Sequence, residues 1–263
     1  MFFSPLEQFL ITPIIFFWLR CFYNGNWYIF VLTNSFIILV LIFALGALFW
    51  KALLAQSKNK NSLLIVANNW QLVIEFFFEL VRSVVVGNLK DKNGKKYFPL
   101  VIALFFFVLL LNLIGLVPYS FTLTSHIIFT LTLSASIFLG INIISVRKHG
   151  LKFFSLFLPS GTSVALAFLL IPIEIISYVF KPISLSIRLF ANMMAGHTLL
   201  KVIAGFASSM VATHVPSLVL ASYIPLLILI PLFGLELAVA LIQSYVYAVL
   251  ISIYIQDSIA INH

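Results

Sequence analysis

The residues with the most evident chemistry are ionisable side chains in the last two long apolar stretches of the chain. Four of them, Glu174, Arg188, His197 and Glu236, lie inside these stretches, and Asp257 lies at the end of the second. An ionisable side chain inside a membrane span costs several kcal/mol, so such residues usually mark an ion or proton path. Their types predict proton transfer around one fixed positive charge.

Arg188 supplies the fixed charge, because a guanidinium keeps its proton at any working pH and cannot relay protons. No acidic residue lies within ten positions of it, so a carboxylate from another subunit would meet it and stay ionised. At about 100° per residue, Asn192 lies about 40° from Arg188 and Ala195 about 20°. Small residues such as Ala195 and Ser184 let another helix approach closely. His197 falls on the opposite face.

The titratable groups are predicted to lie on both sides of the arginine. At about 1.5 Å per residue, Glu174 lies about 21 Å to one side of it along the helix and His197 about 13 Å to the other. If Gln243 on the antiparallel return helix is level with the arginine, Glu236 lies near the height of His197 and Asp257 near that of Glu174. This arrangement favours two half-paths for protons that never meet.

Structural roles remain open for several of these polar residues taken singly. Glu174 could be a polar contact between helices, and His197 could be a satisfied interhelical donor. Asn112 and His126 are interpreted as structural residues or as residues at a helix end.

The composition requires a membrane. Of 263 residues, 63% are hydrophobic and 8% are charged, against about 45–50% and about 25% in soluble domains. The net charge of +8 comes from basic residues in loops, which predicts topology signals and not nucleic-acid binding. The single cysteine, Cys21, excludes an internal disulfide framework. No metal-ligand cluster or phosphate-binding loop is present, so no cofactor is expected.

The predicted fold is an all-α integral membrane protein with about six helices. Glu75, Glu79 and Arg82 share one face of an amphipathic segment, which we interpret as an interfacial helix, with an ordinary span as the alternative. Each of the last two stretches is either one long tilted helix, which we favour, or two helices. The predicted elements are an outer N-terminal segment (1–27), a span (28–50), the interfacial helix (66–89), a hairpin of two spans (98–117 and 125–146) and two long tilted helices (160–201 and 206–256).

Basic residues set the predicted orientation. They concentrate in residues 51–97 and 147–155, whereas the other side carries Arg20 and Lys201. By the positive-inside rule the first side is the cytoplasm or mitochondrial matrix. The N-terminus is therefore expected outside and the C-terminus inside.

Residues 184–197, SLSIRLFANMMAGH, resemble the signature helix of subunit a of the F-type ATP synthase in its mitochondrial form. Residues 112–119, NLIGLVPY, resemble the hairpin motif of this family, and residues 4–9, SPLEQF, resemble plant and protist mitochondrial members. Glu236 with Gln243, and Tyr245 with Tyr247, resemble the final helix.

The resemblance implies a stator subunit beside a rotating ring of c subunits in the mitochondrial inner membrane, with the peripheral stalk and other membrane subunits as further partners. Arg188 matches the essential arginine of the family, and Asn192 and Gln243 show no departure from its pattern. His197 and Glu236 match the outer half-channel, and Glu174 matches an acidic position near the inner exit, on the side where spacing puts Asp257. The chain would translocate protons without binding nucleotide.

Two other classes of membrane protein are weighed against this assignment. A secondary transporter or channel would be built from repeated halves with broken helices, and no internal repeat is visible. A quinone- or haem-carrying subunit of a respiratory complex would require paired histidines across helices. The five histidines, His126, His149, His197, His214 and His263, show no such pairing.

Overall fold

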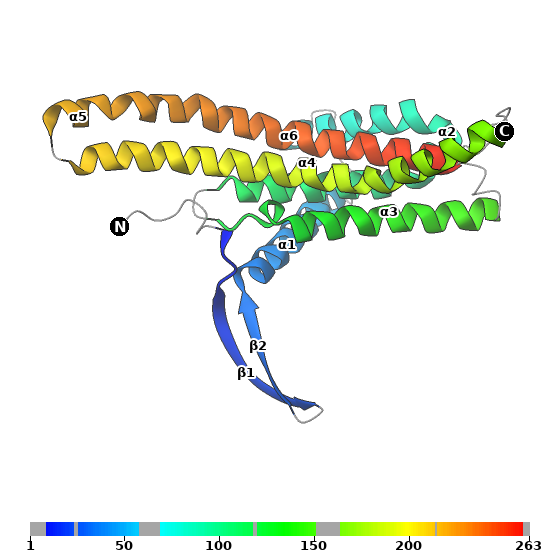
Figure 1. Cartoon of the computed structure of the whole chain (residues 1–263), viewed down its shortest axis with the longest axis horizontal. Coiled ribbons are helices and arrows are strands. Elements are labelled where there is room, and N and C mark those ends of the chain that lie inside the picture. Colours follow the sequence, from blue (N-terminus) through cyan, green and yellow to red (C-terminus); the bar gives the residue numbers. More distant parts are fainter. Residues whose placement is uncertain are drawn as a thin grey trace. The chain divides into compact units, whose positions relative to one another are not determined.

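The structure of the chain, a computed structural model, describes residues 9–23, 26–57, 69–117, 120–150, 164–213 and 215–259 (Figure 1). Within these ranges it has six α-helices and one antiparallel β-hairpin. The elements are β1 (Pro13–Tyr23), β2 (Asn26–Thr33), α1 (Asn34–Ser57), α2 (Asn69–Gly115), α3 (Ile127–His149), α4 (Val164–Ala212), α5 (Pro216–Ala221) and α6 (Tyr223–Ile259), with a 3₁₀ turn at Leu123–Ser125.

Four stretches of the described residues are long and apolar enough to cross a membrane. They are Lys96–Gly115, Ile127–His149, Phe168–Ala212 and Pro216–Ile259. Many of their large apolar side chains are exposed, for example Phe168 at 85% and Leu227 at 72%, as expected where side chains face lipid. The predicted helical membrane fold is confirmed.

The chain forms two compact units, and α2, α4 and α6 contribute residues to both. In the first unit, Leu109–His126 packs with Asn192–Leu241, and β1, β2 and α1 belong to it as well. Its small core joins Leu116, Met193 and Ala240. Asn112, fully buried beside this core, donates from Nδ2 to the carbonyl oxygen of Ala240 at 3.5 Å.

The second unit joins residues of α2, α3, α4 and α6 through buried apolar side chains and a few polar links. Asn88 of α2 donates to Ser252 Oγ of α6 at 2.7 Å. Ser186 of α4 donates to Thr130 Oγ1 of α3 at 3.0 Å. Such side-chain bonds between helices contribute about 0.6 kcal/mol each in a membrane, so packing provides most of the cohesion.

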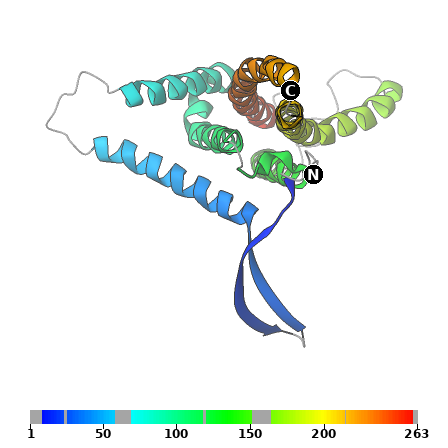
Figure 2. The same ribbon diagram turned by 90° about the vertical axis from the view of Figure 1, so that its left-hand side faces the viewer.

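Helix α2 differs from the prediction, because one helix replaces the interfacial helix, the charged loop and the first span of the hairpin. It runs without interruption from Asn69 to Gly115 and contains Pro99. Proline removes one backbone hydrogen bond of the helix and kinks it, and Figure 2 shows that α2 changes direction along its length. The direction change that we assigned to a loop at residues 90–97 is therefore made by a bent helix. The predicted start at residue 66 lies outside the described residues.

The boundary between the two long helices is also displaced. We expected it at residues 202–205, but α4 continues to Ala212 and α5 begins at Pro216. Proline at the first helical position has no N–H to leave unpaired, so it starts a helix readily. Gly205 does not end α4. The predicted start at residue 160 lies outside the described residues.

The β1–β2 hairpin was not predicted (Figures 1 and 2). The predicted span at 28–50 begins instead as strand β2, and α1 starts at Asn34 and extends to Ser57. Both strands are rich in aromatic and β-branched residues, which favour pairing in a sheet. Apolar runs of this length are ambiguous between strand and helix until a partner strand is known.

Candidate functional site

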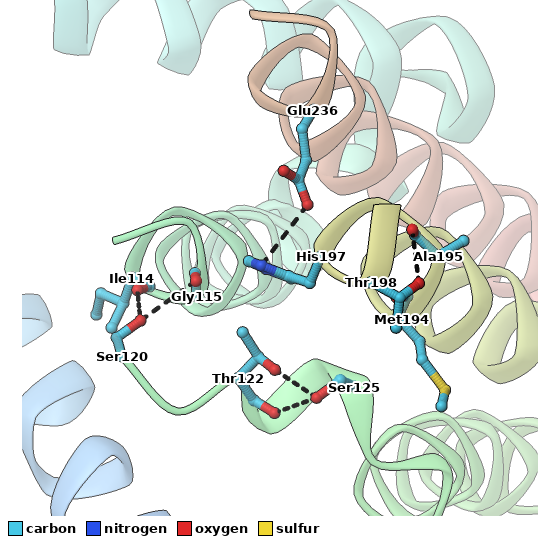
Figure 3. Close-up of polar contacts among 10 residues, drawn as sticks. All are labelled: Ile114, Gly115, Ser120, Thr122, Ser125, Met194, Ala195, His197, Thr198 and Glu236. Atoms are coloured by element: carbon cyan, nitrogen blue, oxygen red, sulfur yellow. Dashed lines mark hydrogen bonds and ion pairs between the residues drawn. The ribbon is translucent and has the colours of Figure 1, made fainter. Parts of the chain in front are cut away.

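Glu236 and His197 form a nearly buried acid–imidazole pair in the first unit. Glu236 projects from α6 toward the ring of His197 on α4 (Figure 3), and its Oε1 lies 3.7 Å from Nδ1. Their side chains are only 5% and 12% exposed. Spacing predicted that the two residues share one height, and the structure brings them together.

Gly196 makes room for Glu236, and Gly115 makes room for Thr122 next to the pair. A Cβ on Gly196 would lie 2.5 Å from Glu236 Oε1, closer than real contacts permit. A Cβ on Gly115 would lie 3.0 Å from Thr122 Cγ2 and 3.9 Å from His197 Nε2. Sequence reasoning missed both roles. The available signal was glycine inside a helix, which is about 1 kcal/mol less favourable than alanine there.

The surroundings of the pair are polar and tightly enclosed. Thr122 and Ser125 hydrogen-bond to each other through their hydroxyls, and Ser125 Oγ also donates to the Thr122 carbonyl oxygen at 2.6 Å (Figure 3). Within the described part of the chain, neither carboxylate oxygen of Glu236 nor His197 Nε2 has a hydrogen-bond partner. Buried polar groups are normally paired with protein or water, so these atoms are the unsatisfied polar positions of the enclosed pair.

His126 directly follows the 3₁₀ turn at Leu123–Ser125 and precedes α3. Its ring stacks on Phe121 with the centroids 4.9 Å apart. Burial lowers the pKa of its imidazole, because desolvation disfavours the charged form.

Arg188 belongs to the second unit and lies on an exposed face of α4. Leu185 and Leu189 point into the protein, with 3% and 0% exposure, whereas Ser184 and Ala191 are exposed beside the arginine. No acidic side chain in the described ranges forms an ion pair with it. The structure thus provides an unneutralised cation on a face with small neighbours.

The two residues expected to assist the arginine lie in different environments. Asn192, one turn further along α4, is exposed. Gln243 of α6 is buried, at 4% exposure. Exposure leaves Asn192 accessible to a partner helix, whereas Gln243 faces the interior of the protein.

Asp257 pairs with a residue that sequence reasoning overlooked. Its Oδ2 lies 3.4 Å from the Nζ of Lys181, whereas we expected it near the height of Glu174, seven residues earlier on α4. Glu174 is half-buried and forms no ion pair within the described residues. Lys181 could have been recognised from its spacing of seven residues to both Glu174 and Arg188, which places all three on one helical face.

Comparisons with known proteins give one consistent result. The family model described as ATP synthase A chain matches residues 34–256. The chain is similar to "ATP synthase subunit a" of Chondrus crispus, with 48% identity over 97% of this chain and 95% of the relative. It is also similar to proteins of that name from Pylaiella littoralis, at 46% identity over all of both chains, and Marchantia polymorpha, at 42% over 98% and 99%.

Proposed function

Since the chain belongs to the ATP synthase A chain family, we propose that it is the stator subunit that carries protons to and from a rotating c-subunit ring. The observation that supports this most directly is the enclosed pair of Glu236 and His197 on two long membrane helices. Because the chain belongs to this family, we set aside the two alternatives, a secondary transporter or channel and a subunit of a respiratory complex. ATP chemistry occurs elsewhere in the complex.

Protons enter from the outer side through Glu236 and His197. The two groups are 3.7 Å apart and nearly buried, so a proton on one can reach the other through a small rotation or one bridging water. Enclosure restricts exchange to this route, because moving a charge through the interior of a membrane span by any other way is costly. The pair delivers the proton to a carboxylate of the ring.

Arg188 separates the outer half-path from the inner one. It attracts an ionised ring carboxylate and cannot itself hand on a proton. Once the ring carboxyl is protonated it is neutral, and it can leave the arginine and move into lipid at much lower cost. The exposed face beside Arg188, with Ser184, Ala191 and Asn192, supports close approach of a ring helix.

Release occurs on the inner side, past Glu174 and Asp257. Asp257 is 48% exposed near the end of α6, and Arg147, Lys148 and His149 occupy the last turn of α3. Basic residues favour the inner side of a membrane, which supports a C-terminus in the matrix, an N-terminus in the intermembrane space and a location in the mitochondrial inner membrane. The peripheral stalk and other membrane subunits complete the complex.

The test is proton-driven ATP synthesis in membrane vesicles that carry Arg188→Ala, compared with wild type at equal assembly. Synthesis should be lost. Arg82→Ala is the matched control, because Arg82 is 61% exposed and pairs only with Glu79 on its own helix within the described residues, a contact of about 0.2–1 kcal/mol. Normal synthesis by the Arg188→Ala complex would refute the proposed function.

A further inference from the structure

Lys181 occupies a position that the proton path described above does not use. It lies on α4 midway between Glu174 and Arg188, with seven residues to each. Seven residues fall about 20° short of two full turns, so the three side chains share one face of the helix. A second basic residue about 10 Å from the arginine requires an explanation, because each charge in a span is costly.

The ammonium group of Lys181 is held by contacts from two helices. Its Nζ lies 3.4 Å from Asp257 Oδ2. It also lies over the rings of Tyr178 and Tyr254, 5.4 Å and 5.2 Å from their centroids. Cation–π contacts of this kind attract a cation to the ring face. Together the three partners define one position for the lysine.

A third helix fixes the ring beneath the lysine. The hydroxyl of Tyr178 donates to Asn142 Oδ1 of α3, which prevents the ring from turning away. A small pocket opens at this point between α3, α4 and α6, and its lining includes Phe138, Ile141, Lys181 and Asp257. The lysine and the aspartate are therefore the charged residues in the lining of this pocket.

We propose that Lys181 is a positioning residue for proton release, which holds the Asp257 carboxylate in place at the wall of this pocket. The inference rests on the proposed function, which includes Asp257 in the inner half-path. The ion pair at 3.4 Å keeps the carboxylate in one position, so a proton that reaches the pocket meets Asp257 at a defined place. No group other than the proton is transferred.

The test compares Lys181→Met with Lys181→Arg in assembled complexes in membrane vesicles. We expect Lys181→Met to lower proton-driven ATP synthesis by about fivefold, the upper limit for a partly exposed ion pair. Lys181→Arg should retain most of the activity, because it keeps the charge. If Lys181 only filled space, Lys181→Met would be the more active of the two variants, since methionine is the better apolar filler. The inference is overturned if Lys181→Met equals wild type, or if arginine restores nothing.

A double variant tests the link to Asp257. If Lys181 acts through this carboxylate, Lys181→Met should add little to the defect of Asp257→Asn. Independent, multiplying defects would contradict the proposal, and this comparison remains decisive if Lys181→Met alone assembles poorly. Arg188→Ala in the same vesicles separates the proposed stator function from the inference about Lys181. If Arg188→Ala abolishes synthesis and Lys181→Met has no effect, the inference about Lys181 fails and the proposed function stands.

Discussion

Gly196→Ala should disable proton uptake by displacing a single carboxylate. The added Cβ would lie 2.5 Å from Glu236 Oε1, 3.0 Å from Cδ and 3.2 Å from Cγ. Ordinary contact requires 3.4–4 Å, so the oxygen must move by about 1 Å in a densely packed interior. It would then leave the position in which it faces His197 at 3.7 Å.

A misplacement of about 1 Å in a reacting group can lower a rate by about 10²-fold. We therefore expect proton-driven ATP synthesis to fall by one to two orders of magnitude at equal assembly. The fold itself should survive, since overpacking typically costs about 1–3 kcal/mol and replacing glycine in a helix recovers about 1 kcal/mol. Synthesis and proton uptake are measured in the same vesicles.

Gly205→Ala is the matched control on the same helix, because its Cβ would meet nothing within 4 Å. It should leave synthesis unchanged. A second check uses Glu236→Asp, whose side chain is one methylene shorter and withdraws from the new methyl group. Adding Gly196→Ala to Glu236→Asp should therefore cause little further loss. Wild-type synthesis by Gly196→Ala would refute the steric reasoning, and so would full additivity with Glu236→Asp.

Three further predictions concern separate parts of the molecule. Glu236→Gln should slow proton uptake in vesicles at least about tenfold, because an amide cannot take up and release protons; undiminished flux would remove Glu236 from the path. Burial lowers the pKa of His126 below its ordinary 6.5, so below that pH the unfolded chain binds a proton that the folded chain does not, and stability falls. The apparent melting temperature of the purified complex should thus decrease less on acidification in His126→Asn than in wild type, and equal slopes would contradict this. Asn88→Ala removes the 2.7 Å hydrogen bond to Ser252 and should lower thermal stability by about 0.5–1 kcal/mol without changing proton flux, which a flux assay beside the melting curve checks.

Local patterns predicted most of the helical architecture. The long apolar runs required membrane helices, because only internal pairing satisfies the backbone in lipid. Helical spacing placed Arg188 and His197 on opposite faces, and in the structure the arginine is exposed while the histidine side chain is 12% exposed. Antiparallel counting put Glu236 level with His197, which agrees with their 3.7 Å separation.

The predictions that differ from the structure concern contacts between residues that are distant in sequence, which local sequence patterns do not contain. Residues 28–33 were predicted as the start of a membrane helix because their apolar run is ambiguous, and pairing of residues 26–33 with residues 13–23 makes them part of a strand. Residues 90–97 read as a loop because they are charged, although lysine and aspartate are tolerated in a helix that Pro99 bends. Straight-helix counting placed Asp257 near the height of Glu174 and named no partner for it, and the structure pairs it with Lys181 on α4, a helix that contains Pro172 and Pro182.

By itself the sequence determined the membrane class, the helices and the residue types available for proton chemistry, since these follow from hydrophobicity and from periodicity along one chain. The tertiary structure alone decided which charges meet. The distances between Glu236 and His197 and between Lys181 and Asp257 depend on how helices distant in sequence pack, at the scale of single ångströms. The need for glycine at 196 has the same origin, because only the packed neighbour shows what a methyl group would strike.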